Sequence, residues 1–387
     1  MRTFLSLFLL VSSVACVDDA VVMNLRGGAL ATAAQVSPGS STDTSIRIQP
    51  RWQLVLSKPS ALAYRPEEHT QPAYNQSGEI VVAGSSAGVV VAADARSGKR
   101  LWIHEVPEGV SDGLLIQGND VYVAGVSGAV FKLDVRTGSS LWEQPYVTPG
   151  SITSAPVFAK NRLVVQTNEN RTYVIDAQNG SYLWDKGRPR AEGLSISGEG
   201  GAAVAGDVVY AGYDDGVLMA MNLMDGSTLW SRSLSGDALQ FVDVDTRPVV
   251  VGDTVYAGSF SVGFFAVGRK HGNIRWAHRT EGVQSATARD GRVYVSLRSH
   301  EVRALDASTG DVLWRTRVGR LSPSRPVVSS NGLWVATGDG VLWLDPNDGN
   351  IRARISPDDG QTAPIAVRDG WIHMVTNFGA FVGARLL

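Results

Sequence analysis

The sequence predicts an all-β protein: a single eight-bladed β-propeller over residues 50–387, closed by pairing of its N- and C-terminal strands. Three observations support this prediction. A turn ending in tryptophan recurs along the chain, a β-hairpin precedes each copy, and the two ends of the repeat region complete each other. The composition agrees, since 42 glycines, 10 tryptophans and only 19% charged residues favour strands and turns over helices.

The turn that ends in tryptophan usually begins with an acidic residue and contains a glycine. Its copies are roughly 40 to 46 residues apart, which is the spacing of propeller blades. An Asp side chain can accept backbone N–H bonds within such a turn, and Gly supplies positive φ. We expect each Trp on the following strand, packed between neighbouring sheets. The copies are "DARSGKRLW" (94–102), "DVRTGSSLW" (134–142), "DAQNGSYLW" (176–184), "NLMDGSTLW" (222–230), "GRKHGNIRW" (268–276), "DASTGDVLW" (306–314) and "DPNDGNIRA" (345–353), which ends in Ala.

Eight predicted β-hairpins alternate with these turns. Their Val, Tyr and Ala residues follow the period of a strand, and Gly with Asp or Asn forms the tips. A sheet of this kind cannot bury both faces alone, so neighbouring sheets must stack on it. The hairpins are residues 78–94, 119–134, 161–176, 207–222, 253–268, 291–306, 332–345 and 370–387.

The first and last segments of the repeat region complete one blade. The last hairpin, 370–387, is followed by no tryptophan strand, whereas the strand "PRWQLVLS" (50–57) carries Trp52 and has no hairpin before it. Joined, they form an eighth blade and close the ring, which protects the terminal strand edges. We therefore expect one domain over residues 50–387 and no second one.

Residues 1–15 have the features of a secretory signal peptide. Arg2 precedes an apolar run, residues 4–11, and the small residues 12–15 follow. The apolar run is too short to span a bilayer as a stable helix.

Cys16, the only cysteine, follows this signal directly. Residues 13–16, Ser-Val-Ala-Cys, resemble a bacterial lipobox, and acyl chains such as palmitate on Cys16 would anchor the protein at a membrane without spanning it. Ordinary cleavage before an incidental cysteine is the alternative. Val17 favours the outer membrane over the inner one. Residues 16–49 are then a lipidated, flexible tether, because residues 34–45 are small and polar with Pro and Gly.

Charges and potential ligand residues argue against several function classes. A formal net charge of −2 gives no overall field for nucleic acid or an anionic membrane surface. A single cysteine allows neither an internal disulfide nor a thiolate metal cluster. The six histidines are scattered, and "DPNDG" (345–349) occupies the repeat turn and lacks the distal Glu of a calcium loop. We therefore predict no metal and no cofactor.

The Asp-x-x-Thr-Gly-x-x-x-Trp pattern, clearest at 134–142 and 306–314, resembles the tryptophan-docking motif of quinoprotein alcohol dehydrogenase propellers. That resemblance implies an enzyme that binds pyrroloquinoline quinone with calcium. Such enzymes often stack the quinone on a disulfide between adjacent cysteines, and they are longer, with inserted loops that form the substrate pocket. This chain has one cysteine and short connections. A quinone-binding dehydrogenase-like propeller is therefore the less favoured alternative, because fold alone does not decide function.

A second resemblance is more specific. Residues 193–222 and 241–258 are similar to the middle of the BamB family, lipoprotein propellers of the outer-membrane β-barrel assembly machinery. The lipobox, the tether, the blade count and the length fit the family too. The resemblance implies a non-enzymatic scaffold at the periplasmic face of the outer membrane. Its implied partners are the POTRA repeats of a BamA-like protein and unfolded β-barrel clients.

In that family, two interblade loops carry the residues that bind the POTRA repeats. Carried over by position, the candidate partner-binding residues are Leu194, Ile196, Ser197, Asp243, Asp245 and Arg247. Ser197 stands where the family pattern has Arg, and Arg190 or Arg247 could replace that arginine. A generic periplasmic propeller that binds another protein or a glycan therefore remains open.

Each candidate also has a structural reading. The carboxylates of Asp243 and Asp245 could simply accept backbone N–H bonds in a polar interblade loop. Leu194 and Ile196 are core residues if their segment is a strand, and hydrophobic anchors for a partner if it is an exposed loop. The aspartates lack the further ligands of a metal site and any sign of the pocket that an acid/base pair needs.

Overall fold

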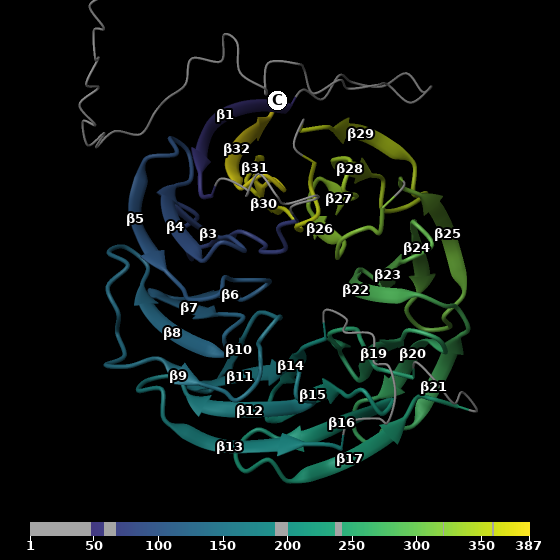
Figure 1. The fold of residues 1–387 in the computed structure, drawn as a ribbon. Helices are drawn as coiled ribbons and strands as arrows, with labels where there is room; N and C mark the ends of the chain where they lie inside the picture. The colour runs from purple at the N-terminus through teal and green to yellow at the C-terminus, as the bar shows by residue number, and fades with distance from the viewer. Residues whose placement is uncertain (1–47, 58–66, 190–199, 237–241, 320, 358–359) are drawn as a thin grey trace, which may run out of the picture.

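The structure is a computed structural model that describes residues 48–57, 67–189, 200–236, 242–319, 321–357 and 360–387. Within these ranges it contains strands and turns and no helix. The strands form eight four-stranded antiparallel sheets, the blades, arranged in a ring about a common axis (Figure 1). The predicted all-β, eight-bladed propeller is confirmed. The predicted signal peptide and Cys16 lie outside the described residues.

Blades are numbered here in chain order. Blade 1 consists of β2 (Ala73–Tyr74), β3 (Ile80–Gly84), β4 (Val89–Asp94) and β5 (Arg100–Glu105). Blade 2 consists of β6 (Leu114–Gln117), β7 (Asp120–Ala124), β8 (Ala129–Asp134) and β9 (Tyr146–Val147). Blade 3 consists of β10 (Val157–Ala159), β11 (Arg162–Thr167), β12 (Arg171–Asp176) and β13 (Tyr182–Gly187). Blade 4 consists of β14 (Ala202–Ala205), β15 (Val208–Gly212), β16 (Val217–Asn222) and β17 (Thr228–Ser233).

The second half of the ring follows the same order. Blade 5 consists of β18 (Val249–Val251), β19 (Thr254–Ser259), β20 (Gly263–Gly268) and β21 (Ile274–His278). Blade 6 consists of β22 (Val283–Arg289), β23 (Arg292–Leu297), β24 (Glu301–Asp306) and β25 (Val312–Arg317). Blade 7 consists of β26 (Val327–Ser329), β27 (Gly332–Ala336), β28 (Val341–Leu344) and β29 (Ile351–Ile355). Blade 8 consists of β30 (Ala366–Arg368), β31 (Trp371–Val375), β32 (Ala380–Leu386) and β1 (Ile48–Val55).

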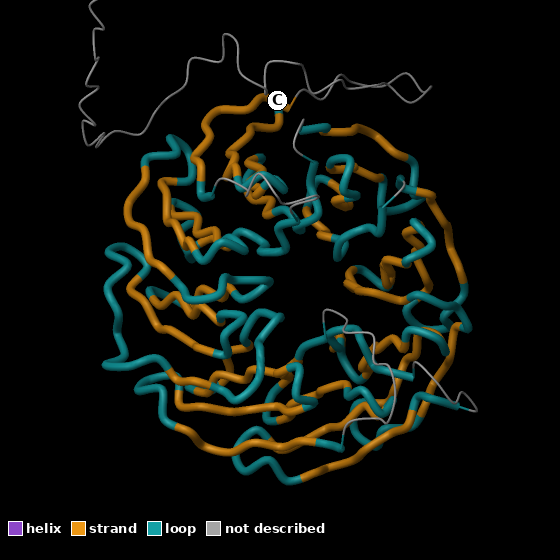
Figure 2. Tube along the Cα trace, in the orientation of Figure 1, coloured by secondary structure: helices purple, strands orange, loops and turns teal. Residues whose placement is uncertain are grey.

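Burial follows the position of a strand in its blade. The first strand of each blade lies nearest the axis and the fourth lies at the rim, with loops joining one blade to the next (Figure 2). The second and third strands are largely buried, as in β3, whereas the rim strand β5 is mostly exposed. Eight apolar clusters fill the ring, one at each interface between neighbouring blades. The sheets therefore bury one another, as the repeat predicts.

A tryptophan docks on the next blade at seven of the eight interfaces. The indole Nε1 of Trp102 donates to the Val135 carbonyl at 2.9 Å, and its ring covers Gly138, where an added Cβ would lie 2.6 Å from the ring. Asp134 accepts the backbone N–H of Thr137 at 2.8 Å, as expected of this turn. The seven donor and acceptor pairs are Trp52 and Ala95, Trp102 and Val135, Trp142 and Gln178, Trp184 and Leu223, Trp230 and Arg269, Trp276 and Ala307, and Trp314 and Pro346.

Two positions depart from the expected pattern. Trp142 lies outside any strand, because β9 is shortened to Tyr146–Val147, yet its indole keeps the bond to the next blade. Ala353, which takes the Trp position in blade 7, is 1% exposed. Blade 8 offers no turn for a tryptophan at that site, since its third and fourth strands, β32 and β1, come from opposite ends of the chain.

The ring closes where β1 pairs with β32, with Ile48 opposite Leu386 and Val55 opposite Ala380. This confirms the predicted closure. The Arg368 guanidinium joins blade 8 to blade 1 by donating to the carbonyls of Asn75 at 2.9 Å and Gln76 at 2.8 Å.

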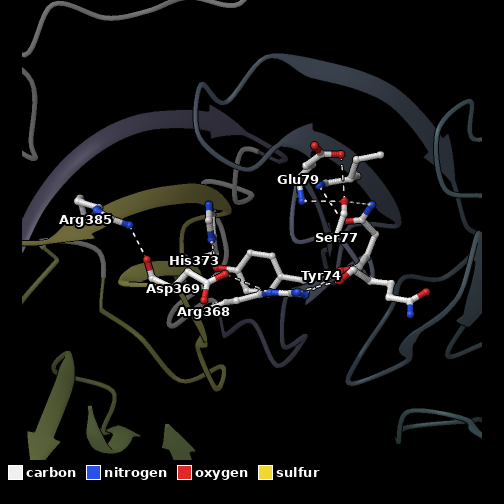
Figure 3. A network of polar contacts seen from close by, with 10 residues as sticks. Tyr74, Ser77, Glu79, Arg368, Asp369, His373 and Arg385 are labelled. Carbon is white, nitrogen blue, oxygen red and sulfur yellow. Dashed lines mark hydrogen bonds and ion pairs between the residues drawn. The ribbon is translucent and has the colours of Figure 1, made fainter. Parts of the chain in front are cut away.

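His373 lies at the interface between blades 8 and 1, fully buried beside Tyr74 (Figure 3). Burial lowers its pKa to about 4, although a hydrogen bond with the Ala95 carbonyl opposes this. The His373 imidazole is therefore neutral. Nε2 donates to that carbonyl at 2.9 Å, and Nδ1 accepts the Tyr74 hydroxyl.

Candidate docking surface

The predicted partner-binding residues fall into two groups. Leu194, Ile196 and Ser197 lie outside the described residues, as does Arg190, and their roles stay predictions. Asp243, Asp245 and Arg247 belong to segment 242–248, which leads into β18 of blade 5.

Segment 242–248 is fixed between blades 4 and 5 by its middle valine. Val244 is 4% exposed and belongs to the apolar cluster of that interface. A Cβ added to Gly212 would lie 2.4 Å from its Cγ1, so only glycine leaves room for this side chain. The Val244 N–H donates to the Tyr213 carbonyl at 3.2 Å. The alternating Asp-Val-Asp pattern thus inserts a valine between two blades.

Asp243 and Asp245 are both buried, with exposed fractions of 3% and 7%. The Asp243 carbonyl accepts the N–H of Phe260 at 3.3 Å, and neither aspartate lacks a partner. Thr246 adds to the attachment, because its Oγ1 accepts the N–H of Gly258 at 2.6 Å. These carboxylates are not displayed on the surface. Their burial is what the interblade-loop alternative expects, and their docking role stays a prediction.

Arg247 extends along the inner ends of three blades. Its Nε donates to the Ala202 carbonyl of blade 4 at 3.0 Å, and its Nη2 donates to the Ala155 carbonyl beside blade 3. Burial, together with the charge of Arg325, lowers its pKa to about 10, and Asp112 opposes that shift. Two carbonyls therefore hold this guanidinium inside the ring.

Arg325 makes a similar connection in the opposite direction around the axis. From the start of β26 it lies 3.4 Å from the Asp112 carboxylate beside blade 2, and it donates to Gln71 Oε1 at 2.6 Å. Gln71 in turn donates to the Ile365 carbonyl at 2.8 Å. The sequence reading missed this arrangement. Its signal is the Arg-Pro-Val run that opens both β18 and β26.

Among the residues that the structure describes, no group of three or more His, Cys, Asp or Glu side chains could hold a metal ion. Over the same ranges, no helix is long and apolar enough to cross a membrane.

The ring of eight blades and the seven docked tryptophans define the class: a propeller built from quinoprotein-type repeats. The family model described as "Outer membrane protein assembly factor BamB" matches residues 86–298 and 266–371. The chain therefore belongs to the BamB family.

Known relatives and structures agree with this membership. The outer membrane protein assembly factor BamB of Yersinia pestis is 26% identical over 321 residues, which cover 78% of this chain and 80% of the relative. The crystal structure of BamB from Moraxella catarrhalis matches with a TM-score of 0.71 and 22% identity, covering 86% of this chain and all of that one.

A quinohemoprotein alcohol dehydrogenase from Comamonas testosteroni has nearly the same fold. It matches with a TM-score of 0.69 and 14% identity, over 88% of this chain and 76% of the enzyme. At that identity the similarity concerns the fold alone.

Proposed function

We propose that this protein is a scaffold of the outer-membrane β-barrel assembly machinery that docks the POTRA repeats of a BamA-like protein and acts without catalysis. The observation that carries the proposal is the BamB family model, which matches residues 86–298 and 266–371. In this proposal, the rigid ring orients the partner while unfolded β-barrel clients are inserted.

The proposed docking surface has two parts. Leu194, Ile196 and Ser197 form one, and segment 242–248 with Asp243, Asp245 and Arg247 forms the other. The second part is supported by its rigidity, since Val244 is buried between blades 4 and 5. A segment fixed in this way loses little conformational entropy on binding, which favours affinity.

The proposal places the protein at the periplasmic face of the outer membrane. Residues 1–15 are removed as a signal peptide, Cys16 receives the lipid, and the predicted tether links it to the propeller, whose first strand begins at Ile48, two residues before the predicted boundary. Mass spectrometry of the mature N-terminus tests this. Acylated Cys16 supports it, and an unmodified N-terminus contradicts it.

The docking proposal is tested by measuring the affinity of the mature protein for the purified POTRA region of the BamA-like protein from the same organism. We expect wild type to bind and the Asp243→Asn/Asp245→Asn variant to bind at least about tenfold more weakly. Because both aspartates are buried, thermal melting must show that the variant folds. Asp290→Asn/Asp369→Asn is the matched control, since those carboxylates are 84% and 86% exposed. Equal binding by wild type and both variants contradicts the docking role of the aspartates.

A second experiment separates the scaffold from the dehydrogenase-like alternative. Pyrroloquinoline quinone and calcium are added to the purified protein, and absorbance and melting temperature are followed. We expect neither to change. A shift in both, with quinone-dependent alcohol oxidation, contradicts the scaffold.

A further inference from the structure

A group of exposed arginines lies beside the proposed docking segment. Arg279 follows β21 in blade 5, Arg298 lies in the turn between β23 and β24, and Arg315 and Arg317 are on the rim strand β25 of blade 6. These four residues are named the arginine cluster. All four are exposed, and over the described ranges none forms an ion pair.

The cluster lies on one face of the ring. In the backbone register of the sheet, Arg317 lies opposite Glu301 at the start of β24. The end of β25 therefore lies beside the β23–β24 turn that carries Arg298. Arg279 lies beside the β19–β20 turn of blade 5, because a Cβ added to Gly263, at the start of β20, would lie 3.2 Å from its Cα. This face, which carries the turns between the second and third strands of the blades, is named the hairpin face.

Backbone hydrogen bonds connect segment 242–248 to the cluster across the hairpin face. The Asp243 carbonyl accepts the Phe260 N–H at 3.3 Å, the Phe260 carbonyl accepts the Gly282 N–H at 2.7 Å, and the Gly282 carbonyl accepts the Arg298 N–H at 2.8 Å. The Arg298 guanidinium also lies 5.3 Å from the centre of the Phe260 ring. The segment and the cluster are thus parts of one continuous, rigid surface.

Neighbouring groups leave the cluster strongly positive. Arg303 lies opposite Arg315 on the neighbouring strand β24. Its charge is neutralised by Glu301, with which Arg303 forms an ion pair at 2.8 Å. Among the described residues of blades 5 to 7, the exposed carboxylates on this face are those of Glu281 and Asp339. Four arginines therefore exceed the carboxylates around them.

The potential at this face also affects a neighbouring histidine. Burial lowers the pKa of His278, and the Arg303 guanidinium, whose Nη1 lies 3.5 Å from its Nε2, lowers it further. Its ring therefore stays neutral.

We propose that the arginine cluster is the electrostatic part of the docking surface, and that it binds an acidic patch on the protein that docks at segment 242–248. The inference rests on the proposed function and adds the chemistry of the partner. Arginine suits this role, because its planar guanidinium forms bidentate bonds to carboxylates.

A protein fits the cluster better than an anionic lipid surface does. The described chain enters the ring at Ile48, which pairs with Leu386 at the end of β32. That end of the ring is opposite the hairpin face, because β32 starts at the turn between the second and third strands of blade 8. Ile48, the first described residue, therefore lies at the face opposite the cluster, whereas segment 242–248 lies beside it.

The test compares two triple charge reversals in the mature protein. Arg298→Glu/Arg315→Glu/Arg317→Glu changes the cluster, and Arg96→Glu/Arg100→Glu/Arg136→Glu makes the same change at exposed positions in or beside third-to-fourth-strand turns of blades 1 and 2. Binding kinetics to the purified POTRA region are measured from about 0.05 to about 0.5 M salt. We expect the cluster variant to lose about tenfold or more in affinity at low salt, mainly through slower association, and the control to lose under about threefold. The difference should shrink as salt rises.

Each outcome decides between defined alternatives. If wild type binds and the cluster variant binds equally well, or both triples lose equally, the inference fails while the proposed function stands. If wild type does not bind the POTRA region, the proposed function fails, and the inference with it. Vesicles with and without phosphatidylglycerol supply the other arm. Suppose that wild type binds vesicles with phosphatidylglycerol but not those without it, and that the cluster variant loses this binding while it still binds the POTRA region as wild type does. The cluster is then a lipid-binding surface, and the inference is overturned.

Discussion

Acidification should weaken the closure of the ring through His373. The folded-state pKa of this buried imidazole is about 4, below the ordinary value of 6.5. The unfolded chain therefore binds a proton more readily over that interval, and stability rises with pH across it. The stabilisation from the neutral ring is complete above about pH 6.5 and is lost as pH falls toward 4. A difference of about 2.5 pKa units is worth about 3 kcal/mol, of which about 2 kcal/mol is lost by pH 5.

The assay is urea unfolding followed by tryptophan fluorescence, for wild type and His373→Gln, from neutral pH to about pH 4. Glutamine can donate to the Ala95 carbonyl and accept from Tyr74 but does not titrate in this range. We expect wild type to be the more stable protein at neutral pH and its advantage to shrink by about 2 kcal/mol at pH 5. Other titrating groups, such as buried Glu68, are common to both proteins and cancel. A constant difference over the whole range would refute the reasoning.

Four substitutions, of which Gly118→Ala is a control, test the tryptophan docking and the inner arginine Arg325 by the same unfolding assay. Gly310→Ala should lower the free energy of unfolding by about 2 kcal/mol or more, because φ is +79° and the new Cβ would lie 2.6 Å from Trp276. Gly118→Ala should lower it by only about 1 kcal/mol, because φ is +62° there and nothing lies within 4 Å of the new Cβ. Equal losses would show that backbone strain alone matters. Ala353→Trp should destabilise by about 1–3 kcal/mol, since this buried position has no turn to receive an indole, and a stabilised variant would contradict that account. Arg325→Gln should cost about 1–3 kcal/mol by leaving the Asp112 carboxylate without its cation, and an unchanged midpoint would show that this ion pair contributes nothing.

The fold was predictable because the repeat carries its own physical logic. Asp306 shows this well, since hydrogen bonds from the Ser308 side chain, its backbone and the Thr309 backbone lower the pKa of its carboxyl, as an Asp that closes a turn requires. The eighth blade was predictable because the strand that carries Trp52 supplies the fourth strand missing after the last hairpin. Such features are local or periodic, so sequence alone reveals them.

The environment of the candidate site was not predictable in the same way. Whether Asp243 is displayed or buried depends on how Val244 fits against Gly212, a contact between residues of different blades. The direction of the Arg247 side chain depends on which carbonyls face the axis, and those belong to blades 3 and 4. Contacts of this kind arise only when successive blades pack against one another, so no short window of sequence contains them.

The two parts of the described docking surface offer a partner different things. Segment 242–248 has its aspartates buried and its arginine bound to carbonyls, so it offers mainly a fixed shape. The arginine cluster offers charge, on side chains that are exposed and without ion pairs in the described ranges. Shape governs mainly how slowly a complex dissociates, whereas long-range charge governs how fast it forms. Neutralising Asp243 and Asp245 should therefore raise the dissociation rate at any salt concentration. Reversing Arg298, Arg315 and Arg317 should lower the association rate at low salt alone. If both sets of substitutions changed the same rate constant with the same salt dependence, this division of roles would be wrong.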